Sequence, residues 1–167
     1  LKEAIGFWGD VVGRQAEQEL RSIYESEISE AFPIAYLWAR KIHCEGPGCG
    51  AEIPLLHSLW IAKKGNRSVA VRFTLDKVHK KIGFEIIEKK AGKWYRQCDL
   101  NRGPQLGDVS IDIKSLDGTV KRGSATCPLC GYTTPVNHVR EQLKQERGGT
   151  HSAILYAVIL NHKKEGT

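Results

Sequence analysis

Cysteines carry the strongest chemical signal in this sequence, because four of the five form two closely spaced pairs. Four residues separate Cys44 from Cys49, two separate Cys127 from Cys130, and a glycine follows each pair. Two tight turns that each supply two thiolates can place four soft ligands around one tetrahedral Zn²⁺ ion. Four thiolates leave no open coordination position, so the expected ion is structural rather than catalytic.

Disulfide bonds and a redox Cys-x-x-Cys motif are the alternatives to this zinc site. An odd number of cysteines and no secretory leader at the start of the chain favour a reducing, cytoplasmic location. The second pair and the absence of a βαβ pattern argue against a redox motif. Cys98 is expected to be an ordinary thiol. His43, next to Cys44, is either a strand residue or a replacement ligand.

Signatures of common enzyme classes are missing from the sequence. The six histidines form no His-Glu-x-x-His pair, and neither a Gly-x-Ser-x-Gly elbow nor a phosphate-binding Gly-x4-Gly-Lys-Ser/Thr loop is present. A zinc-dependent hydrolase or nuclease is therefore disfavoured.

Positive charge is concentrated in the middle of the chain. The formal net charge is +6, and the segment from His57 to Arg96 holds eleven basic residues but only three acidic ones. Such asymmetry is typical of proteins that bind a polyanion, most often nucleic acid, although a merely solubilising surface is the alternative. The candidate DNA-contacting residues are Lys63, Lys64, Arg67, Arg72, Lys77, Lys80, Lys81, Lys121 and Arg122.

The order of predicted elements indicates an α+β fold. Apolar residues at spacings of three and four from Ile5 to Ile23 predict an N-terminal helix that ends before Pro33. A strand is expected over 35–43 and a short extended segment over 51–56. The pattern then predicts three hairpins, with strands at 58–62 and 68–75, at 84–89 and 93–98, and at 109–114 and 118–125.

The C-terminal part is expected to contain a helix and a closing strand. Thr134 is the predicted N-cap and Pro135 the first helical residue, and the helix is expected to stop at Gly148-Gly149. The β-branched, apolar segment 152–160 predicts a buried strand. Trp60 either packs in a core or stacks on a base, with the core favoured.

The predicted domain organisation is an N-terminal helix over 1–31 that links to another domain, followed by a zinc-ribbon domain over 32–167. The basic hairpins form an insertion at 57–117, between the two cysteine pairs. No apolar run reaches the roughly 20 residues needed to span a bilayer, so no membrane association is expected. Because methionine is absent, the chain is expected to be a segment of a longer protein.

Two stretches of the chain carry a family resemblance. Pro33–Arg72 contains P-I-A-Y-L-W-A-R-K-I-H-C, E-G-P-G-C-G-A-E-I-P-L-L and H-S-L-W-I-A-K-K-G-N-R-S-V-A-V-R, and Gly118–Arg140 contains G-T-V-K-R-G-S-A-T-C-P-L-C-G-Y-T-T-P-V-N-H-V-R. Both stretches resemble the internal cysteine-containing region of a family of large adenine-specific DNA methylases of bacteria and archaea. The segment from Val78 to Val109 carries no such resemblance.

The resemblance implies a parent protein that binds S-adenosylmethionine and methylates an adenine amino group in DNA. Such enzymes use a glycine-rich cofactor loop and an Asp/Asn-Pro-Pro-Tyr motif for the flipped base, and neither is present in this chain. The chain is therefore expected to be a non-catalytic accessory module beside the methylase core, with DNA as its partner.

A structural or protein-interaction scaffold is the second functional hypothesis. It would be favoured by an exposed apolar face on the N-terminal helix together with basic residues that are scattered rather than clustered. The sequence leaves the recognised DNA sequence and the oligomeric state open.

Overall fold

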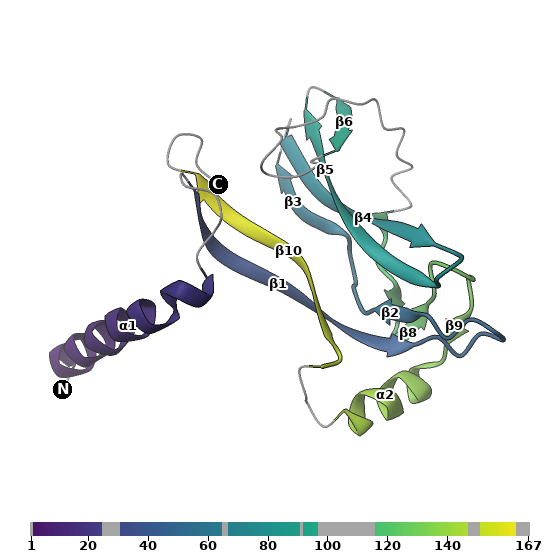
Figure 1. Cartoon of the computed structure of the whole chain (residues 1–167), viewed down its shortest axis with the longest axis horizontal. Coiled ribbons are helices and arrows are strands. Elements are labelled where there is room, and N and C mark those ends of the chain that lie inside the picture. Colours follow the sequence, from purple (N-terminus) through teal and green to yellow (C-terminus); the bar gives the residue numbers. More distant parts are fainter. Residues whose placement is uncertain are drawn as a thin grey trace. The chain divides into compact units, whose positions relative to one another are not determined.

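The computed structural model describes residues 2–24, 31–64, 67–90, 92–96, 116–146 and 151–162. These residues form an α+β fold with two helices and mostly antiparallel strands, in agreement with the sequence-based prediction (Figure 1). The chain divides into two compact units, one of Leu1–Tyr36 with Val158–Thr167 and one of Leu37–Ala157. Within the described residues, no helix has the length and apolar character needed to cross a membrane.

Helix α1 (Lys2–Tyr24) is the N-terminal helix predicted from the apolar periodicity. Ile5, Trp8 and Val12 recur at the predicted spacing, and these residues are 62–64% exposed. A stripe of this kind normally faces a core. In α1 it is presented to solvent instead.

One sheet has the strand order β10-β1-β2 and consists of β1 (Ala31–His43), β2 (Glu52–Pro54) and β10 (Ala153–His162). β1 begins before the predicted strand and includes Pro33. Pro33 lies outside Lys41–His43, the part of β1 that pairs with β2, so β2 requires no hydrogen bond from the Pro33 nitrogen. The strand predicted over 152–160 is present as β10, but it is only partly buried: Ala157 is buried, whereas Leu155 and Val158 are 38% and 40% exposed.

A second, four-stranded antiparallel sheet contains β3 (Trp60–Lys64), β4 (Arg67–Asp76), β5 (Lys81–Lys90) and β6 (Lys93–Arg96) in chain order. The first two predicted hairpins are confirmed, because β3 pairs with β4 and β5 pairs with β6.

The β4–β5 hairpin was missed by the sequence analysis. Its turn over 77–80 contains no glycine, and Lys80 itself adopts a positive φ of 54°. The Asp76 carboxylate accepts hydrogen bonds from the backbone N–H groups of Val78 and His79, both at 3.0 Å. Aspartate that bonds the backbone two residues on is a known turn signal. Asp76 was therefore the residue that could have revealed the turn.

A third sheet is formed by the short strands β7 (Val120–Lys121), β8 (Ser124–Thr126) and β9 (Thr133–Thr134). The prediction of one continuous strand over 118–125 is wrong. Lys121 pairs with Ser124 across a two-residue turn, in which Arg122 and Gly123 both have positive φ, as hairpin turns of this length require. Its predicted partner strand, 109–114, lies outside the described residues.

Helix α2 (Val136–Gln145) follows β9, one residue later than predicted. The N-cap is Pro135 rather than Thr134, and it makes no side-chain capping hydrogen bond. The helix ends at Gln145 with Glu146 as C-cap, so it stops before the predicted Gly148-Gly149, which lies outside the described residues.

Two clusters of buried residues form the core. The first lies against the four-stranded sheet and contains Ala39, Leu56, Leu59, Ala70, Ile87, Trp94 and Leu116. Trp60 packs against it with its ring centroid 5.6 Å from that of Trp94, which supports a core role for Trp60. The second surrounds the cysteines and contains Ile42, Cys44, Ala51, Ile53, Ala125, Cys127 and Val139.

The segments that lead into and out of the four-stranded sheet lie side by side. Ser58 and Asp117 form an antiparallel bridge, and the N–H of Val120 donates to the carbonyl of Leu56 at 3.0 Å. The Thr119 hydroxyl donates to the carbonyl of Pro54 at 2.5 Å and accepts a hydrogen bond from the N–H of Leu56 at 3.1 Å. This junction joins the chain that follows the first cysteine pair to the chain that precedes the second.

Candidate metal centre

The first cysteine pair lies in the loop between β1 and β2. The N–H of Cys44 donates to the carbonyl of Ala51 at 2.8 Å, and the N–H of Cys49 donates to the carbonyl of Gly46 at 2.9 Å, so the loop folds back on itself. The N–H of Gly46 points at the Cys44 sulfur, 3.3 Å away. Gly50, directly after the pair, has a φ of +65°, which permits the sharp turn into β2.

The second pair lies in the loop between β8 and β9 and has the same design. The N–H of Cys127 donates to the carbonyl of Tyr132 at 2.8 Å, and the N–H of Gly131 donates to the carbonyl of Cys127 at 2.9 Å. The N–H of Tyr132 points at the Cys130 sulfur at 3.5 Å, and Gly131 has a φ of +78°. The predicted turns, with a glycine after each pair and amides facing sulfur, are thus present in both loops.

The two loops bring the four predicted cysteines together. The sulfur atoms of Cys44, Cys49, Cys127 and Cys130 all lie within 4.8 Å of one another, although 77 residues separate the pairs. The distance from Cys44 to Cys130 is 3.5 Å and that from Cys49 to Cys127 is 3.9 Å. A tetrahedron of thiolates about 2.3 Å from a zinc ion has sulfur–sulfur edges of about 3.8 Å, whereas a disulfide bond is about 2.05 Å long. The spacing fits a metal site, and these four cysteines are not disulfide-bonded.

The environments of the sulfurs differ in how readily they lose a proton. Burial raises the pKa of Cys44 and of Cys127, because an apolar surrounding disfavours the thiolate. The hydrogen bond from the Tyr132 N–H lowers the pKa of the exposed Cys130 thiol. A bound cation would compensate the negative charge that burial otherwise disfavours, and its binding would release protons.

Helix α2 holds the first cysteine loop by contacts that sequence reasoning missed. The Gln142 side chain pairs with the His43 backbone like a neighbouring strand, accepting from its N–H at 2.8 Å and donating to its carbonyl at 3.1 Å. His138 Nδ1 lies 2.7 Å from a carboxylate oxygen of Glu45. The four-residue spacing of His138 and Gln142 places both side chains on one face of α2. This spacing is the feature of the sequence that could have indicated that both residues contact the same neighbouring segment. His43 is the last residue of β1 and is not part of the metal-ligand group.

We predict that His138 titrates above the ordinary histidine value of 6.5, because the Glu45 carboxylate raises its pKa. A raised folded-state pKa means that this pair stabilises the fold fully below pH 6.5, as long as Glu45 stays ionised, and loses its effect as pH rises through the folded pKa of His138. An NMR titration of the His138 ring protons in the metal-loaded protein measures this value. In Glu45→Gln the midpoint should fall toward 6.5, and an unchanged midpoint would contradict the assignment.

We predict that Gly46→Ala disturbs the metal centre directly. A Cβ at this position would lie 2.9 Å from the Tyr132 Cβ and 3.1 Å from the Cys130 sulfur, so the loop must shift. The visible spectrum of the Co²⁺-substituted protein, which reports ligand geometry, should change, and metal affinity should fall about tenfold. Gly48→Ala is the matched control, because a Cβ there meets nothing within 4 Å and only its φ of +68° is strained. A Gly46→Ala spectrum identical to that of the wild type would show that the loop accommodates the added Cβ without changing the ligand geometry.

The structure separates the nine candidate DNA-contacting residues rather than gathering them on one face. Lys63, Lys64 and Arg67 lie beside the β3–β4 connection, and Lys77, Lys80 and Lys81 lie at the opposite end of β4. Ten residues of β4 span about 30 Å at about 3.3 Å per residue. Side chains alternate between the two faces of a strand, so Lys63 and Lys64 also point to opposite faces.

Three of the nine are partnered by carboxylates. Arg67 pairs with Glu88 and Arg72 with Glu85, both at 2.5 Å, and Lys121 lies 4.0 Å from Asp117. Lys63 lies over the ring of Trp60, with 4.8 Å between its Nζ and the ring centroid. Lys80 donates to the carbonyl of Gly48 in the first cysteine loop at 2.5 Å. Lys64, Lys77, Lys81 and Arg122 are exposed.

Cys98 lies outside the described residues.

Comparison with protein-family models, with curated proteins and with solved structures finds no match for the chain.

Proposed function

We propose that Cys44, Cys49, Cys127 and Cys130 hold one structural Zn²⁺ ion and that the chain is a zinc-ribbon module. A single observation carries this proposal: sulfur atoms from two distant loops meet within 4.8 Å, at the spacing of a tetrahedral thiolate site. The four ligands fill the coordination sphere, so the ion would stabilise the fold rather than react with a substrate.

The module would serve as an accessory part of an adenine-specific DNA methylase. Support comes from the resemblance of Pro33–Arg72 and Gly118–Arg140 to that family, since these two segments contain both cysteine loops. S-adenosylmethionine would bind to the methylase core of the parent protein, because its cofactor loop and catalytic motif are absent from this sequence. The zinc ribbon itself would stabilise the accessory module and orient it relative to the methylase core.

DNA contact is proposed for the lysines near the metal centre. Lys77, Lys80 and Lys81 lie on or beside the β4–β5 turn, and the Lys80 bond to Gly48 ties this turn to the first cysteine loop. Lysine contacts to phosphate give affinity without reading sequence. Arg67 and Arg72 are weaker candidates, because their charges are already balanced by Glu88 and Glu85.

The DNA proposal is tested by measuring duplex affinity of the zinc-loaded protein at several salt concentrations. Each phosphate contact contributes a slope of about −0.9 to log K against log salt, so three contacts predict about −2.7. Lys77→Ala should reduce the slope by about one, and Lys2→Ala, in α1, should leave it unchanged. Binding that does not depend on salt would rule out phosphate contact.

Protein docking through α1 is a second candidate function, and two observations favour it. Ile5, Phe7, Trp8 and Val12 are at least 60% exposed on α1, and the basic candidates are dispersed over both ends of the four-stranded sheet and the β7–β8 hairpin. These are the features expected of a scaffold that packs against a methylase core. The two functions use different parts of the chain, so both can hold. Trp8→Glu should abolish association with the methylase core while leaving DNA affinity unchanged.

A further inference from the structure

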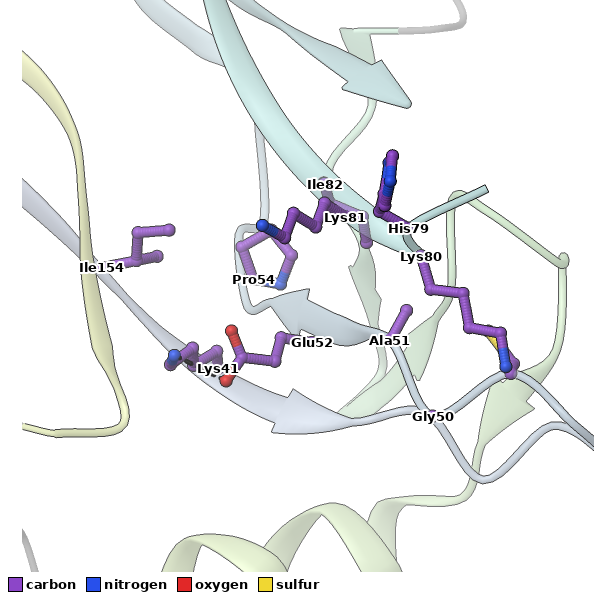
Figure 2. A pocket seen from close by; sticks show the side chains of 11 residues that line it. Lys41, Gly50, Ala51, Glu52, Pro54, His79, Lys80, Lys81, Ile82 and Ile154 are labelled. Carbon is purple, nitrogen blue, oxygen red and sulfur yellow. Dashed lines mark hydrogen bonds and ion pairs between the residues drawn. The ribbon is translucent and has the colours of Figure 1, made fainter. Parts of the chain in front are cut away.

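A cavity of about 530 Å³ opens beside the first cysteine loop (Figure 2). Its walls come from two segments, 49–54 and the β4–β5 connection over 79–82, together with Lys41 of β1 and Ile154 of β10. All of these residues belong to the unit Leu37–Ala157. The cavity thus lies within one compact body, where the metal centre and the hairpin meet.

Charge around this cavity favours an anion. Lys41, Lys80 and Lys81 line it, opposed by Glu52 as the only carboxylate among its lining residues. Lys41 is bonded to Glu52 at 2.6 Å, as Figure 2 shows, and Lys80 uses one of its three N–H donors on Gly48. Lys81 is exposed and forms no salt bridge in the described part of the chain, although its charge helps to lower the pKa of Asp76, which lies across from it on β4. Its ammonium group and the remaining N–H donors of Lys80 are therefore accessible to a ligand.

The rest of the lining is apolar. Pro54 and Ile82 are buried or half-buried, and Ile154 enters from β10 on the side opposite the hairpin turn. Lysines beside an apolar wall suit a molecule with a charged group and a flat or apolar body. A phosphate attached to a nucleoside has this combination.

The metal centre builds part of the same cavity. Cys49 is itself a lining residue, and the wall continues directly from it through Ala51 to β2. The Lys80 contact is made to Gly48, which lies between the two cysteines of the loop. A loop without its metal would lose the fixed position of this wall and of the Lys80 partner.

We propose that this cavity is a binding site for a phosphate group, carried by a nucleotide or by a nucleic-acid strand, and that binding requires the metal centre. The inference depends on the proposed zinc site and narrows the proposed DNA contact to one location. Because coupling between two sites is reciprocal, phosphate should also tighten metal binding.

The test uses the zinc-loaded full chain, with isothermal titration and amide NMR shifts as the two measurements. The probes are inorganic phosphate, a dinucleotide and a short single-stranded DNA, each at constant ionic strength. Shifts should be concentrated in 48–52 and 79–82. Lys81→Ala should weaken phosphate binding about tenfold, and Glu52→Gln should strengthen it about threefold. Lys93→Ala, which removes the same charge at the end of the sheet remote from the β4–β5 turn, is the control and should change nothing.

The outcomes separate this proposal from the broader one. DNA binding that leaves the amides of 48–52 and 79–82 unshifted overturns the cavity site but not DNA contact. Phosphate binding at these amides without DNA binding supports the site and identifies a free phosphate compound as its source. Equal losses of phosphate affinity in Lys81→Ala and Lys93→Ala would show only diffuse electrostatic attraction and overturn the proposal. A protein that binds no zinc would instead contradict the metal site itself.

Discussion

Removal of zinc with a chelator is expected to unfold the region around the four cysteines while the four-stranded sheet stays folded. Cys44 and Cys127 are themselves buried members of the second core cluster, together with Ile42, Ile53 and Val139. Without the ion, that cluster would lose the metal–sulfur bonds that join the two cysteine loops. Structural zinc sites contribute about 10–16 kcal/mol of apparent binding free energy, so the expected dissociation constant lies between about tens of nanomolar and picomolar.

The sheet should survive because it has its own core. β4 and β5 pair along their full length, from Arg67 with Lys90 to Asp76 with Lys81, and Ala70 and Ile87 are completely buried between them and their neighbours. Hydrogen exchange measured before and after chelation distinguishes the two regions. Protection should be lost in β2, β8 and α2 and retained in β4 and β5, and zinc should restore it. Equal protection throughout a protein verified to be metal-free would contradict the structural role.

Substitution of a ligand should have the same effect as the chelator. Cys127→Ser replaces a buried thiolate by a poor zinc ligand and should lower metal affinity at least about 100-fold, because even residues that only orient ligands affect affinity by about 10–100-fold. Cys98→Ser is the matched control, since the four other cysteines already fill a tetrahedral site. The thiolate-to-metal absorption of the Co²⁺ form measures both variants. A cobalt spectrum unchanged in Cys127→Ser would remove this residue from the ligand set.

Local chemistry made part of this structure predictable from the sequence. The glycines after Cys49 and Cys130 identify sharp turns, and both have the positive φ that the paired spacing implies. The first two hairpins were found for a similar reason, because Gly and Asn mark the ends of their strands. The β4–β5 turn was missed because Lys80 takes a conformation that lysine rarely adopts, supported by the Asp76 hydrogen bonds.

Features that depend on tertiary contacts could not be read from the chain. The dispersal of the lysines follows from strand length and register, which place Lys64 and Lys81 at opposite ends of β4. The ion pairs of Arg67 and Arg72 likewise require the strand register, which puts Glu85 directly across from Arg72 and puts Glu88 two residues along β5 from the position opposite Arg67. The sequence correctly indicated an excess of positive charge, but it could not show which of the basic side chains form ion pairs with carboxylates.

The junction between the two cysteine loops explains how cysteine pairs with 77 residues between them come together at one site. Closing a free loop of that length costs about 4 kcal/mol of chain entropy. Here the segments after the first loop and before the second are already joined, by hydrogen bonds between Leu56 and Val120 and between Pro54 and Thr119. Because the junction fixes the chain close to each loop, a bound metal ion would have to order only two short segments.

Gly118→Ala is therefore expected to be among the most damaging single substitutions in this protein. A Cβ at Gly118 would lie 2.0 Å from the carbonyl oxygen of Leu56 and 2.4 Å from the carbonyl carbon of His57, and these are backbone atoms that cannot rotate away. The two segments must separate, which breaks the bond from the Gly118 N–H to the His57 carbonyl and strains the neighbouring ones. The expected loss is about 3 kcal/mol of unfolding free energy, at the upper end of the overpacking range.

Denaturant unfolding of the zinc-loaded protein measures this loss, with Gly92→Ala as the control. A Cβ at Gly92 meets nothing within 4 Å, so only its φ of +82° opposes the change, at a cost of about 1 kcal/mol. Because the junction holds the two loops near each other, Gly118→Ala should also weaken zinc binding, whereas Gly92→Ala should not. If Gly118→Ala lost stability but bound zinc as tightly as the wild type, the junction would pack the fold without positioning the metal ligands.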